Sequence, residues 1–357
     1  MKSLAIYGAG MVAVSVYTAI KFLYKDCRII AFLVSKKEGN PAEIDRIPVI
    51  ALEELSEKGV KILIAVPENH HPAIRKGLEE RNWKDYVCID SRREAALMER
   101  YYKATGEYPS LHDFPTGQKG AAGGELSLRV YMTRFHKDVV LRNPCPSFSW
   151  LFPVQAGAAL TELSVALEKD NTGDHISEKN GNYSELTALY WIWKNKGCEG
   201  EESDYLGLFH YRRILDITQE DLQRIAACGI DVILPYPTIH DPSIEEHHRR
   251  YVKDCDWEAM VSALEELAPE YAKKLPEIFS QSCFYNYNML VARKKIFCGF
   301  CSWLFPILQR TEELSVPRGW ERSDRYIGYL GESLTTLYFL CHKEDWKIAH
   351  TGRLMLT

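Results

Sequence analysis

The 357-residue sequence contains no run of about 20 apolar residues, so we expect no segment that crosses a bilayer. The N-terminus also lacks the cleavage pattern of a signal peptide, because Met1-Lys2-Ser3 leads straight into an apolar stretch. The ten cysteines are not spaced as a disulfide framework and are typical of reduced thiols. These absences predict a cytoplasmic protein.

The sequence has no excess of positive charge. Its net charge is −5, and a protein that neutralises many phosphates without sequence preference needs a basic face. We therefore expect no nucleic-acid partner. Hydrophobic residues make up 46% and charged residues 26%, which excludes disordered and fibrous chains. The length suggests about two domains.

Strand and helix patterns alternate over residues 1–90. The predicted strands are Leu4–Tyr7, Arg28–Val34, Ile47–Ile50, Lys61–Val66 and Tyr86–Ile89, and helices are expected up to about Tyr24, near Ala51–Lys58 and at His71–Trp83. Strands separated by helices indicate a parallel sheet with right-handed crossovers. The fold class predicted for this part is α/β, with a Rossmann-like parallel sheet.

A glycine-rich turn follows the first predicted strand. Gly8, Gly10 and Ala13 form a G-x-G-x-x-A pattern that lets a phosphate approach a helix N-terminus, so they are candidate nucleotide-binding residues. The acidic residue that binds a ribose is missing after Val34, where the chain reads Ser35-Lys36-Lys37, and this argues against NAD. The alternative is a domain used for packing or oligomerisation, whose glycines serve the turn.

A change of composition divides the chain. A predicted helix at Ser91–Ala104 is followed by a Gly/Pro-rich stretch that ends in Gly123-Gly124. We predict a Rossmann-like domain at 1–104, a linker at 105–125 and a second domain at 126–357.

The second domain carries several polar motifs in a fixed order. They read D-N-T-G-D-x-I-S-x-K-N from Asp170, S-E-L-T-x-L-Y-W-I-W-K-N from Ser184, G-L-x-H-Y-R-R from Gly207, N-M-L-V from Asn288 and G-Y-L-G-E from Gly328. We expect one amphipathic helix from about Tyr183 to Lys194 and a strand at Tyr205–Phe209. A second helix is expected to open at Gly331 and to end near Cys341.

These motifs resemble a bacterial family of capsular and exopolysaccharide glycosyltransferases that was first catalogued as a domain of unknown function. The resemblance covers about two thirds of the chain and implies a GT-A-like α/β domain. It implies a nucleotide-sugar donor, a UDP-sugar first of all, and a lipid-linked or oligosaccharide acceptor. Contact with the inner membrane face would follow from such an acceptor. Residues 1–90 resemble the Rossmann-like domain of other polysaccharide-synthesis enzymes, which can hold a nucleotide-sugar.

The chain lacks an Asp-x-Asp where GT-A enzymes hold a divalent metal. The end of Tyr205–Phe209 carries His210-Tyr211-Arg212-Arg213 instead. Guanidinium groups bind phosphate oxygens bidentately and keep their charge. We expect Arg212 or Arg213 to neutralise the diphosphate, so that no metal or other cofactor is required. The alternative is an arginine pair in a salt-bridge network.

A carboxylate is needed to accept the proton of the acceptor hydroxyl. Glu332, expected at a helix start, is the first candidate for this catalytic base, and Asp324 is the second. The alternative for Glu332 is a first-turn glutamate that interacts with the helix dipole.

Further polar residues are candidates for donor binding. The alternatives are N-capping and turn hydrogen bonds for the loop residues, and a satisfied polar group beside the core for the histidine of the arginine motif. The candidates are His136, Asn171, Asp174, Ser177, Asn180, Glu185, His210 and Asn288.

The sequence therefore predicts a glycosyltransferase of polysaccharide synthesis. Two other classes stay open, namely a nucleotide-sugar-binding scaffold without turnover and an NAD-dependent sugar oxidoreductase. A homo-oligomer is compatible with either domain. The sugar, the linkage and the acceptor are not encoded in any pattern that we recognise.

Overall fold

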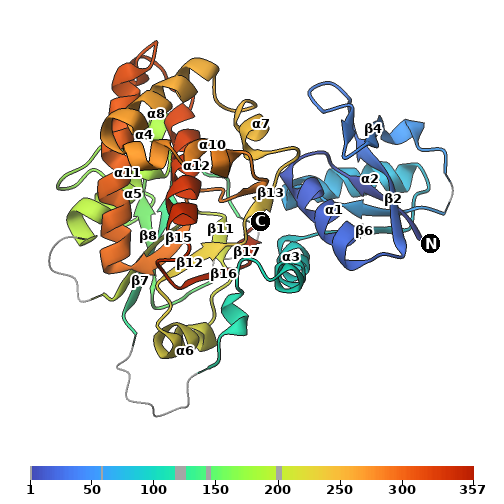
Figure 1. The fold of residues 1–357 in the computed structure, drawn as a ribbon, viewed down its shortest axis with the longest axis horizontal. Coiled ribbons are helices and arrows are strands. Elements are labelled where there is room, and N and C mark those ends of the chain that lie inside the picture. Colours follow the sequence, from blue (N-terminus) through green and yellow to red (C-terminus); the bar gives the residue numbers. More distant parts are fainter. Residues whose placement is uncertain (1, 58, 117–125, 142–145, 198–202) are drawn as a thin grey trace.

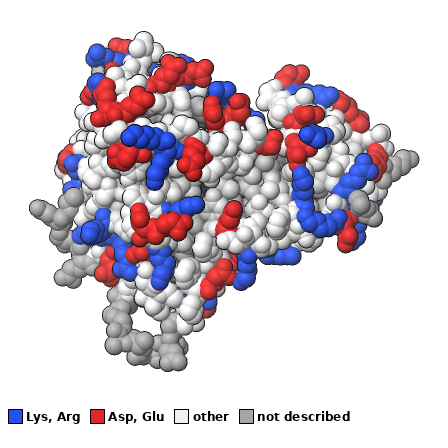
Figure 2. Space-filling model, viewed as in Figure 1, with Lys and Arg blue, Asp and Glu red and all other residues white. Residues whose placement is uncertain are grey.

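The computed structural model describes residues 2–57, 59–116, 126–141, 146–197 and 203–357. The chain forms two α/β units side by side, each built on its own sheet (Figure 1). On the face shown in Figure 2, positive and negative side chains lie interspersed over both units. No helix in the described part of the chain is long and apolar enough to cross a membrane.

The first unit is a six-stranded sheet in the order β3-β4-β2-β1-β5-β6. Every pair is parallel except β3 with β4. The five parallel strands therefore follow the Rossmann order 3-2-1-4-5, which confirms the predicted fold class. The strands are β1 (Lys2–Tyr7), β2 (Cys27–Val34), β3 (Glu43–Ile44), β4 (Ile47–Ala51), β5 (Lys61–Ile64) and β6 (Tyr86–Cys88).

Helices cover both faces of this sheet. The helices α1 (Met11–Leu23) and α3 (Ser91–Thr105) share one core, and α2 (His71–Glu80) packs on the opposite face. The helix expected near Ala51–Lys58 is wrong, because only a 3-10 turn forms at Leu52–Glu54. Leu52 is the one buried side chain among residues 52–57, and so little apolar surface cannot hold a longer helix.

The second unit is a seven-stranded sheet in the order β16-β12-β15-β10-β7-β8-β9. The sheet is parallel except for β15, which runs antiparallel to both neighbours. Its strands are β7 (Leu128–Arg134), β8 (Leu151–Gln155), β9 (Glu168–Lys169), β10 (Tyr205–Phe209), β12 (Val232–Pro235), β15 (Leu290–Arg293) and β16 (Ile348–Thr351). Two ribbons pair β11 (Arg213–Leu215) with β17 (Arg353–Met355), and β13 (Thr238–Ile239) with β14 (Cys283–Phe284).

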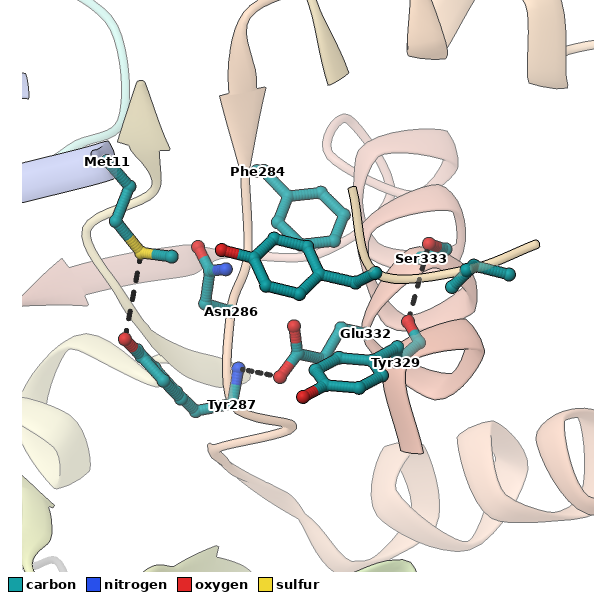
Figure 3. A pocket seen from close by; sticks show the side chains of 9 residues that line it. Met11, Phe284, Asn286, Tyr287, Tyr329, Glu332 and Ser333 are labelled. Atoms are coloured by element: carbon teal, nitrogen blue, oxygen red, sulfur yellow. Dashed lines mark hydrogen bonds between the residues drawn. The ribbon is translucent and has the colours of Figure 1, made fainter. Parts of the chain in front are cut away.

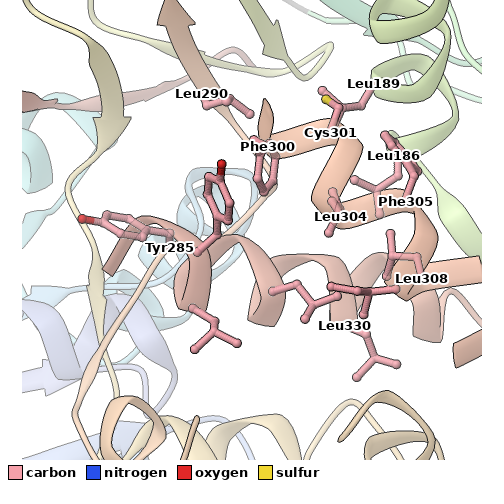
Figure 4. Close-up of a cluster of buried hydrophobic side chains, with 14 of the residues drawn as sticks. Leu186, Leu189, Tyr285, Leu290, Phe300, Cys301, Leu304, Phe305, Leu308 and Leu330 are labelled. Carbon is pink, nitrogen blue, oxygen red and sulfur yellow. The ribbon is translucent and has the colours of Figure 1, made fainter. Parts of the chain in front are cut away.

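Helices pack on both faces of the second sheet. The larger core joins Leu206 and Leu208 of β10 to apolar faces of α8, α11 and α12. Figure 4 shows part of this core, including Leu186 of α5, Leu304 of α11 and Leu330 of α12. The helices are α4 (Asn180–Tyr183), α5 (Leu186–Ile192), α6 (Gln219–Cys228), α7 (Ile244–His248), α8 (Asp254–Leu267), α9 (Pro269–Ala272), α10 (Leu275–Phe279), α11 (Lys294–Leu314) and α12 (Tyr326–Cys341). On the opposite face, α6 packs with Tyr205 and Phe209 of β10.

The helix expected from Tyr183 to Lys194 is interrupted. Ser184 adopts a left-handed conformation with φ of 51°, so α4 ends before it and α5 begins after Glu185. The side chain of Asn180 donates hydrogen bonds to the Ser184 carbonyl and to Thr187, which holds the break in place. The chain then continues from Trp193 to Gly197 as a π-helical turn.

The two units touch through specific contacts. The hydroxyl of Ser15 on α1 accepts a hydrogen bond from the backbone of Ile239, and Tyr102 on α3 donates to the Pro237 carbonyl. The described part of the predicted linker packs on the second unit, where Leu111 is fully buried. Residues 117–125 of that linker lie outside the described residues, and the domain boundaries stay a prediction.

Candidate functional site

The arginine motif lies directly after the central strand of the second sheet. All five residues of β10 are buried between β7 and β15, and the chain turns immediately after the strand. His210 and Arg213 exchange two backbone hydrogen bonds, so Tyr211 and Arg212 form the turn. Arg213 then begins β11 and pairs with Met355 of β17.

Arg213 faces the gap between the two units. Its guanidinium carbon lies 4.3 Å from the ring centre of Tyr287, and that of Arg353 lies 4.7 Å from the same ring. Burial lowers the pKa of Arg213, and the neighbouring Arg353 adds to this shift. Because an arginine stays protonated near neutral pH, two poorly solvated cations share one aromatic ring here.

A pocket of about 380 Å³, including its open mouth, separates these arginines from the Rossmann-like unit. Val12 of α1 and the residues after β5 line one side, and Arg213 and Arg353 line the other. Glu94 of α3 lies 3.5 Å from Arg353. Burial raises the pKa of Glu94, with Arg353 opposing the shift. The carboxyl edge of the first sheet, where ligands bind in such folds, thus faces the arginines of the second unit.

The predicted glycine motif lies at this edge. Gly8 has a φ of +130°, and a Cβ there would lie 2.5 Å from the carbonyl oxygen of Ala65. Gly10 is the N-cap of α1 and has open space where a Cβ would be, while Ala13 is fully buried. Close packing therefore accounts for Gly8, and nucleotide binding by Gly8, Gly10 and Ala13 stays a prediction.

Arg212 points to a different group from Arg213. Its charge lies close to Asp138, at the carboxyl end of β7, where Arg134 and His136 also lie. Burial raises the pKa of Asp138, and a hydrogen bond from the Phe135 backbone and these cations oppose the shift. The two arginines of the motif therefore lie beside different groups at the same edge of the sheet, Arg212 near Asp138 and Arg213 on Tyr287.

Three buried nitrogens at this edge lack hydrogen-bond partners among the described residues. They are Nδ1 of His136, Nε2 of His210 and Nε of Arg212. All three belong to residues that the sequence marked as donor-binding or catalytic. A buried polar group without a partner costs about 1–3 kcal/mol, so such groups are rare unless a ligand or water completes them.

His210 lies in a second layer of polar contacts. Its Nε2 is 3.8 Å from Oε1 of Glu185, which is beyond hydrogen-bond distance. Burial lowers the pKa of His210, although Glu185 opposes this shift. The same Glu185 oxygen accepts a 2.8 Å hydrogen bond from the side chain of Asn288. The fold thus brings together three of the predicted donor-binding residues, Glu185, His210 and Asn288.

Glu332 belongs to the same cluster. The expectation that it opens a helix is wrong, because α12 begins at Tyr326 and Glu332 lies in its second turn. The glycine at position 331 favoured a turn before the helix, whereas Gly331 lies inside α12. A carboxylate oxygen of Glu332 accepts a 3.0 Å hydrogen bond from the backbone of Tyr287. Burial raises the pKa of Glu332 to about 8, and the charge of Glu185 contributes to the rise.

Several residues around Glu332 adopt strained backbone conformations. Tyr287 and Asn288 are consecutive non-glycine residues with φ of 74° and 48°. Ser184 and Arg325 also have positive φ, and Arg325 donates a 2.9 Å hydrogen bond to the Ser184 hydroxyl. Such conformations cost about 1–3 kcal/mol each and cluster at functional sites.

Asp324 lies in a separate ion-pair group. Its exposed carboxylate binds Arg322, and Arg322 also forms two hydrogen bonds of 2.8 and 2.7 Å with the fully buried Asp256. The assignment of Asp324 as a catalytic base stays a prediction.

The polar loop before α4 is occupied by internal contacts. Asp170 accepts hydrogen bonds from the backbone of Gly157 and Ala158 and from the Ser177 hydroxyl. Asp174 accepts from Tyr190, and Asn180 holds the break before α5. No described contact brings Asn171, Asp174, Ser177 or Asn180 to the Glu332 cluster. Donor binding by this loop stays a prediction.

The described residues contain no group of three or more His, Cys, Asp or Glu side chains arranged to hold a metal ion.

Sequence reasoning missed several residues at the site. Arg213 and Arg353 both stack on the ring of Tyr287, and Tyr251, Tyr329 and Met11 line the pocket that contains Glu332. Tyr287 lies directly before the predicted Asn288, one residue outside the motif. Arg353 and Met11 come from opposite ends of the chain, and nothing in their local sequence indicates this meeting.

Comparison with known proteins agrees with this architecture. The chain resembles a solved structure described as "WbbM bifunctional glycosytransferase apo structure", with 28% identity and a TM-score of 0.53. The similarity covers 65% of this chain and 45% of that chain, so the chain spans less than half of that protein. This likeness confirms that a GT-A-like α/β unit follows the Rossmann-like unit along the chain. No curated protein matches the chain. The model of the family described as "Domain of unknown function (DUF4422)" matches residues 129–344, and the chain therefore belongs to this family.

Proposed function

We propose that the protein is a glycosyltransferase that moves a sugar from a nucleotide-sugar, first of all a UDP-sugar, to a glycan acceptor in capsular or exopolysaccharide synthesis. The observation that carries the proposal is the row of unpartnered buried nitrogens on His136, His210 and Arg212. They lie at the carboxyl edge of the central strands, where α/β folds bind ligands. The likeness to a glycosyltransferase structure supports the reaction class.

The arginines would stabilise the leaving group. When the bond between the anomeric carbon and the phosphate oxygen breaks, its electron pair stays on the diphosphate. Arg212 and Arg213 offer fixed positive charge at this place, which is worth most where water is excluded. Because Arg213 is poorly solvated, its electrostatic attraction to a bound anion is stronger than that of an exposed arginine.

Glu332 would accept the proton of the acceptor hydroxyl as its oxygen attacks the anomeric carbon. A carboxyl with a pKa of about 8 is matched to proton transfer near neutral pH. The hydrogen bond from Tyr287 holds one carboxylate oxygen and leaves the other for the acceptor. In this scheme Asn288 and Glu185 keep the backbone around Tyr287 in position.

The test is release of UDP from a panel of UDP-glucose, UDP-galactose and UDP-N-acetylglucosamine, with and without acceptor glycans. The protein is expected to bind UDP, to show a higher melting temperature with it and to transfer a sugar from at least one donor. A scaffold would bind UDP but release none from the donors, and the variant Glu332→Gln would leave its binding unchanged. An absence of any nucleotide or donor binding would refute the proposal.

A further inference from the structure

A second cavity lies beside Glu332, between the two units. Its cavity volume is about 170 Å³, which suits one small ring rather than a drug-sized ligand. Figure 3 shows Met11 on one side and Tyr329 and Glu332 on α12 on the other, with Asn286 and Tyr287 between them. The remaining described lining residues are Tyr251, Val252, Phe284 and Ser333.

Four of the nine described lining residues are aromatic. The rings of Tyr251 and Tyr329 lie 5.4 Å apart and are tilted by 31°. Tyr251 is 49% exposed at the mouth of the cavity, which is unusual for a large aromatic side chain. Aromatic faces of this kind bury the C–H face of a sugar ring, while the hydroxyl groups around its rim seek hydrogen bonds.

The polar groups that reach the cavity fit an uncharged ligand. They are the carboxyl of Glu332, the amide of Asn286 and the hydroxyl groups of Ser333 and the tyrosines. None of the described lining residues is a lysine or arginine. A phosphate or a sugar carboxylate would therefore meet the Glu332 carboxyl in the cavity with no cation in the described lining, since Arg213 and Arg325 act on Glu332 from outside that lining. The pocket with Arg213 and Arg353, which shares Tyr287 with this cavity, has the opposite character.

The Rossmann-like unit supplies one wall of the cavity. Met11 is the first residue of α1, and its sulfur accepts a hydrogen bond of 3.6 Å from the Tyr287 hydroxyl. The thioether side chain is flexible and polarisable, and can adapt its apolar surface to a ligand. The cavity is therefore complete only when both units are in contact.

We propose that this cavity is the acceptor subsite and that it binds a neutral pyranose at the end of the acceptor glycan, between Met11 of the first unit and Tyr251 and Tyr329 of the second. The sugar stacks on the aromatic wall and presents one hydroxyl to Glu332. The inference rests on the proposed function for its role, but the binding site itself is testable without turnover. It also assigns a role to the Rossmann-like unit, which contributes to acceptor recognition.

Direct binding tests the site first. The probes are methyl β-D-glucopyranoside, methyl β-D-galactopyranoside, lactose and cellobiose, with methyl β-D-glucuronide as the charged comparison, in saturation-transfer NMR on the full chain. At least one neutral probe is expected to bind, and Tyr251→Ala and Met11→Trp are expected to weaken it about tenfold. Tyr24→Ala, which removes a tyrosine that is 37% exposed on the first unit, is the matched control.

Three results would overturn the proposal. They are that no neutral probe binds, that neither cavity variant changes the affinity for a neutral probe, or that the glucuronide binds best. Circular dichroism of each variant shows whether it is folded, and Met11→Trp and Tyr251→Ala alter opposite walls, so a folding defect in one leaves the other as the test.

Kinetics then separate this proposal from the proposed function. With an active donor, Tyr251→Ala is expected to raise the KM for the acceptor about tenfold, while the Kd for UDP changes less than twofold. If neutral sugars bind in the cavity but no donor is ever turned over, the proposed function fails and the sugar site stands. If transfer occurs with an unchanged acceptor KM in both variants, the acceptor subsite fails and the transferase stands.

Discussion

The backbone N–H of Tyr287 donates a hydrogen bond of 3.0 Å to the carboxylate of Glu332, and this bond joins the candidate base to the ring on which Arg213 stacks. Tyr287 also has a positive φ of 74°, which is a strained conformation for a residue other than glycine. The strain at this residue is therefore compensated by contacts on both of its sides. The groups proposed for leaving-group stabilisation and for proton transfer share one residue.

The pH dependence of transfer follows from Glu332. Only its ionised form accepts a proton, and its pKa is raised to about 8, so kcat/KM is expected to rise with pH up to about 8 and then level off. The variant Glu332→Gln should lower kcat about 10²- to 10⁴-fold while UDP binding persists. Initial rates from pH 5.5 to 9.5 give the profile. A flat profile, or full activity in the variant, would contradict the assignment.

The same residue has a consequence for stability. A carboxyl whose pKa is higher in the folded state than its usual value of 4.5 stabilises the fold below pH 4.5, and this stabilisation is lost as the pH rises through about 8. Glu332→Gln is therefore expected to gain stability relative to the parent protein between pH 6 and pH 9. Urea unfolding at both pH values measures the difference, and a constant difference would show that Glu332 is not protonated in the fold.

Arg213 is expected to contribute to binding of the diphosphate. Arg213→Lys keeps the charge but loses the planar donor fork, so it should weaken UDP binding about tenfold. Isothermal titration measures this, and Arg310→Lys is the matched control, because Arg310 pairs with Glu266 on a different helix.

Transfer is also expected to persist in excess chelator. Activity that is abolished by chelator and restored by manganese would argue for a metal instead.

His350 should make the fold sensitive to acid. It is buried, with Nε2 at 2.8 Å from the Tyr285 hydroxyl, and burial lowers its pKa to about 4. A histidine with a depressed pKa must be neutral in the fold, so its contribution is present above pH 6.5 and is lost as the pH falls toward 4. The loss amounts to about 3 kcal/mol. Urea unfolding at pH 7.5 and 4.5 should show a smaller difference in His350→Gln than in the parent.

The two glycines of the first turn should differ in their tolerance of a side chain. Gly8→Ala would place a Cβ 2.5 Å from the Ala65 carbonyl at a φ of +130°, and is expected to cost about 2 kcal/mol or more. Gly10→Ala meets open space and should cost less than about 1 kcal/mol. Melting temperatures of the two variants test this. Loss of UDP binding in folded Gly10→Ala would support a nucleotide site at this turn.

Much of the architecture could be predicted from the sequence. The strands of the first sheet are short apolar runs such as Leu4–Tyr7, and each is followed by a turn and a helical pattern, which defines a parallel α/β unit. The position of Arg213 was also predictable, because β10 is continuously apolar and ends at Phe209, directly before the arginine motif. In these cases a local pattern alone determines the element.

The rest depends on contacts between distant segments. Ser184 breaks a helix that its neighbours favour, because Asn180 and Arg325 bind it in a left-handed conformation. Arg353 reaches the site through the pairing of β17 with β11, and Met11 reaches it only after both units have packed together. The raised pKa of Glu332 likewise results from burial and from Glu185, and neither is visible in the motif around it.

The ribbon of β11 and β17 connects the two units mechanically. β17 pairs with the strand that begins at Arg213, and its Met355 backbone donates a 2.9 Å hydrogen bond to Ser91 at the start of α3. A hinge motion that parted the units would have to break this bond or pull β17 along with α3. If β17 moved with α3, the guanidinium groups of Arg213 and Arg353 would move together. The positive charge at the site would then depend on whether the two units are in contact.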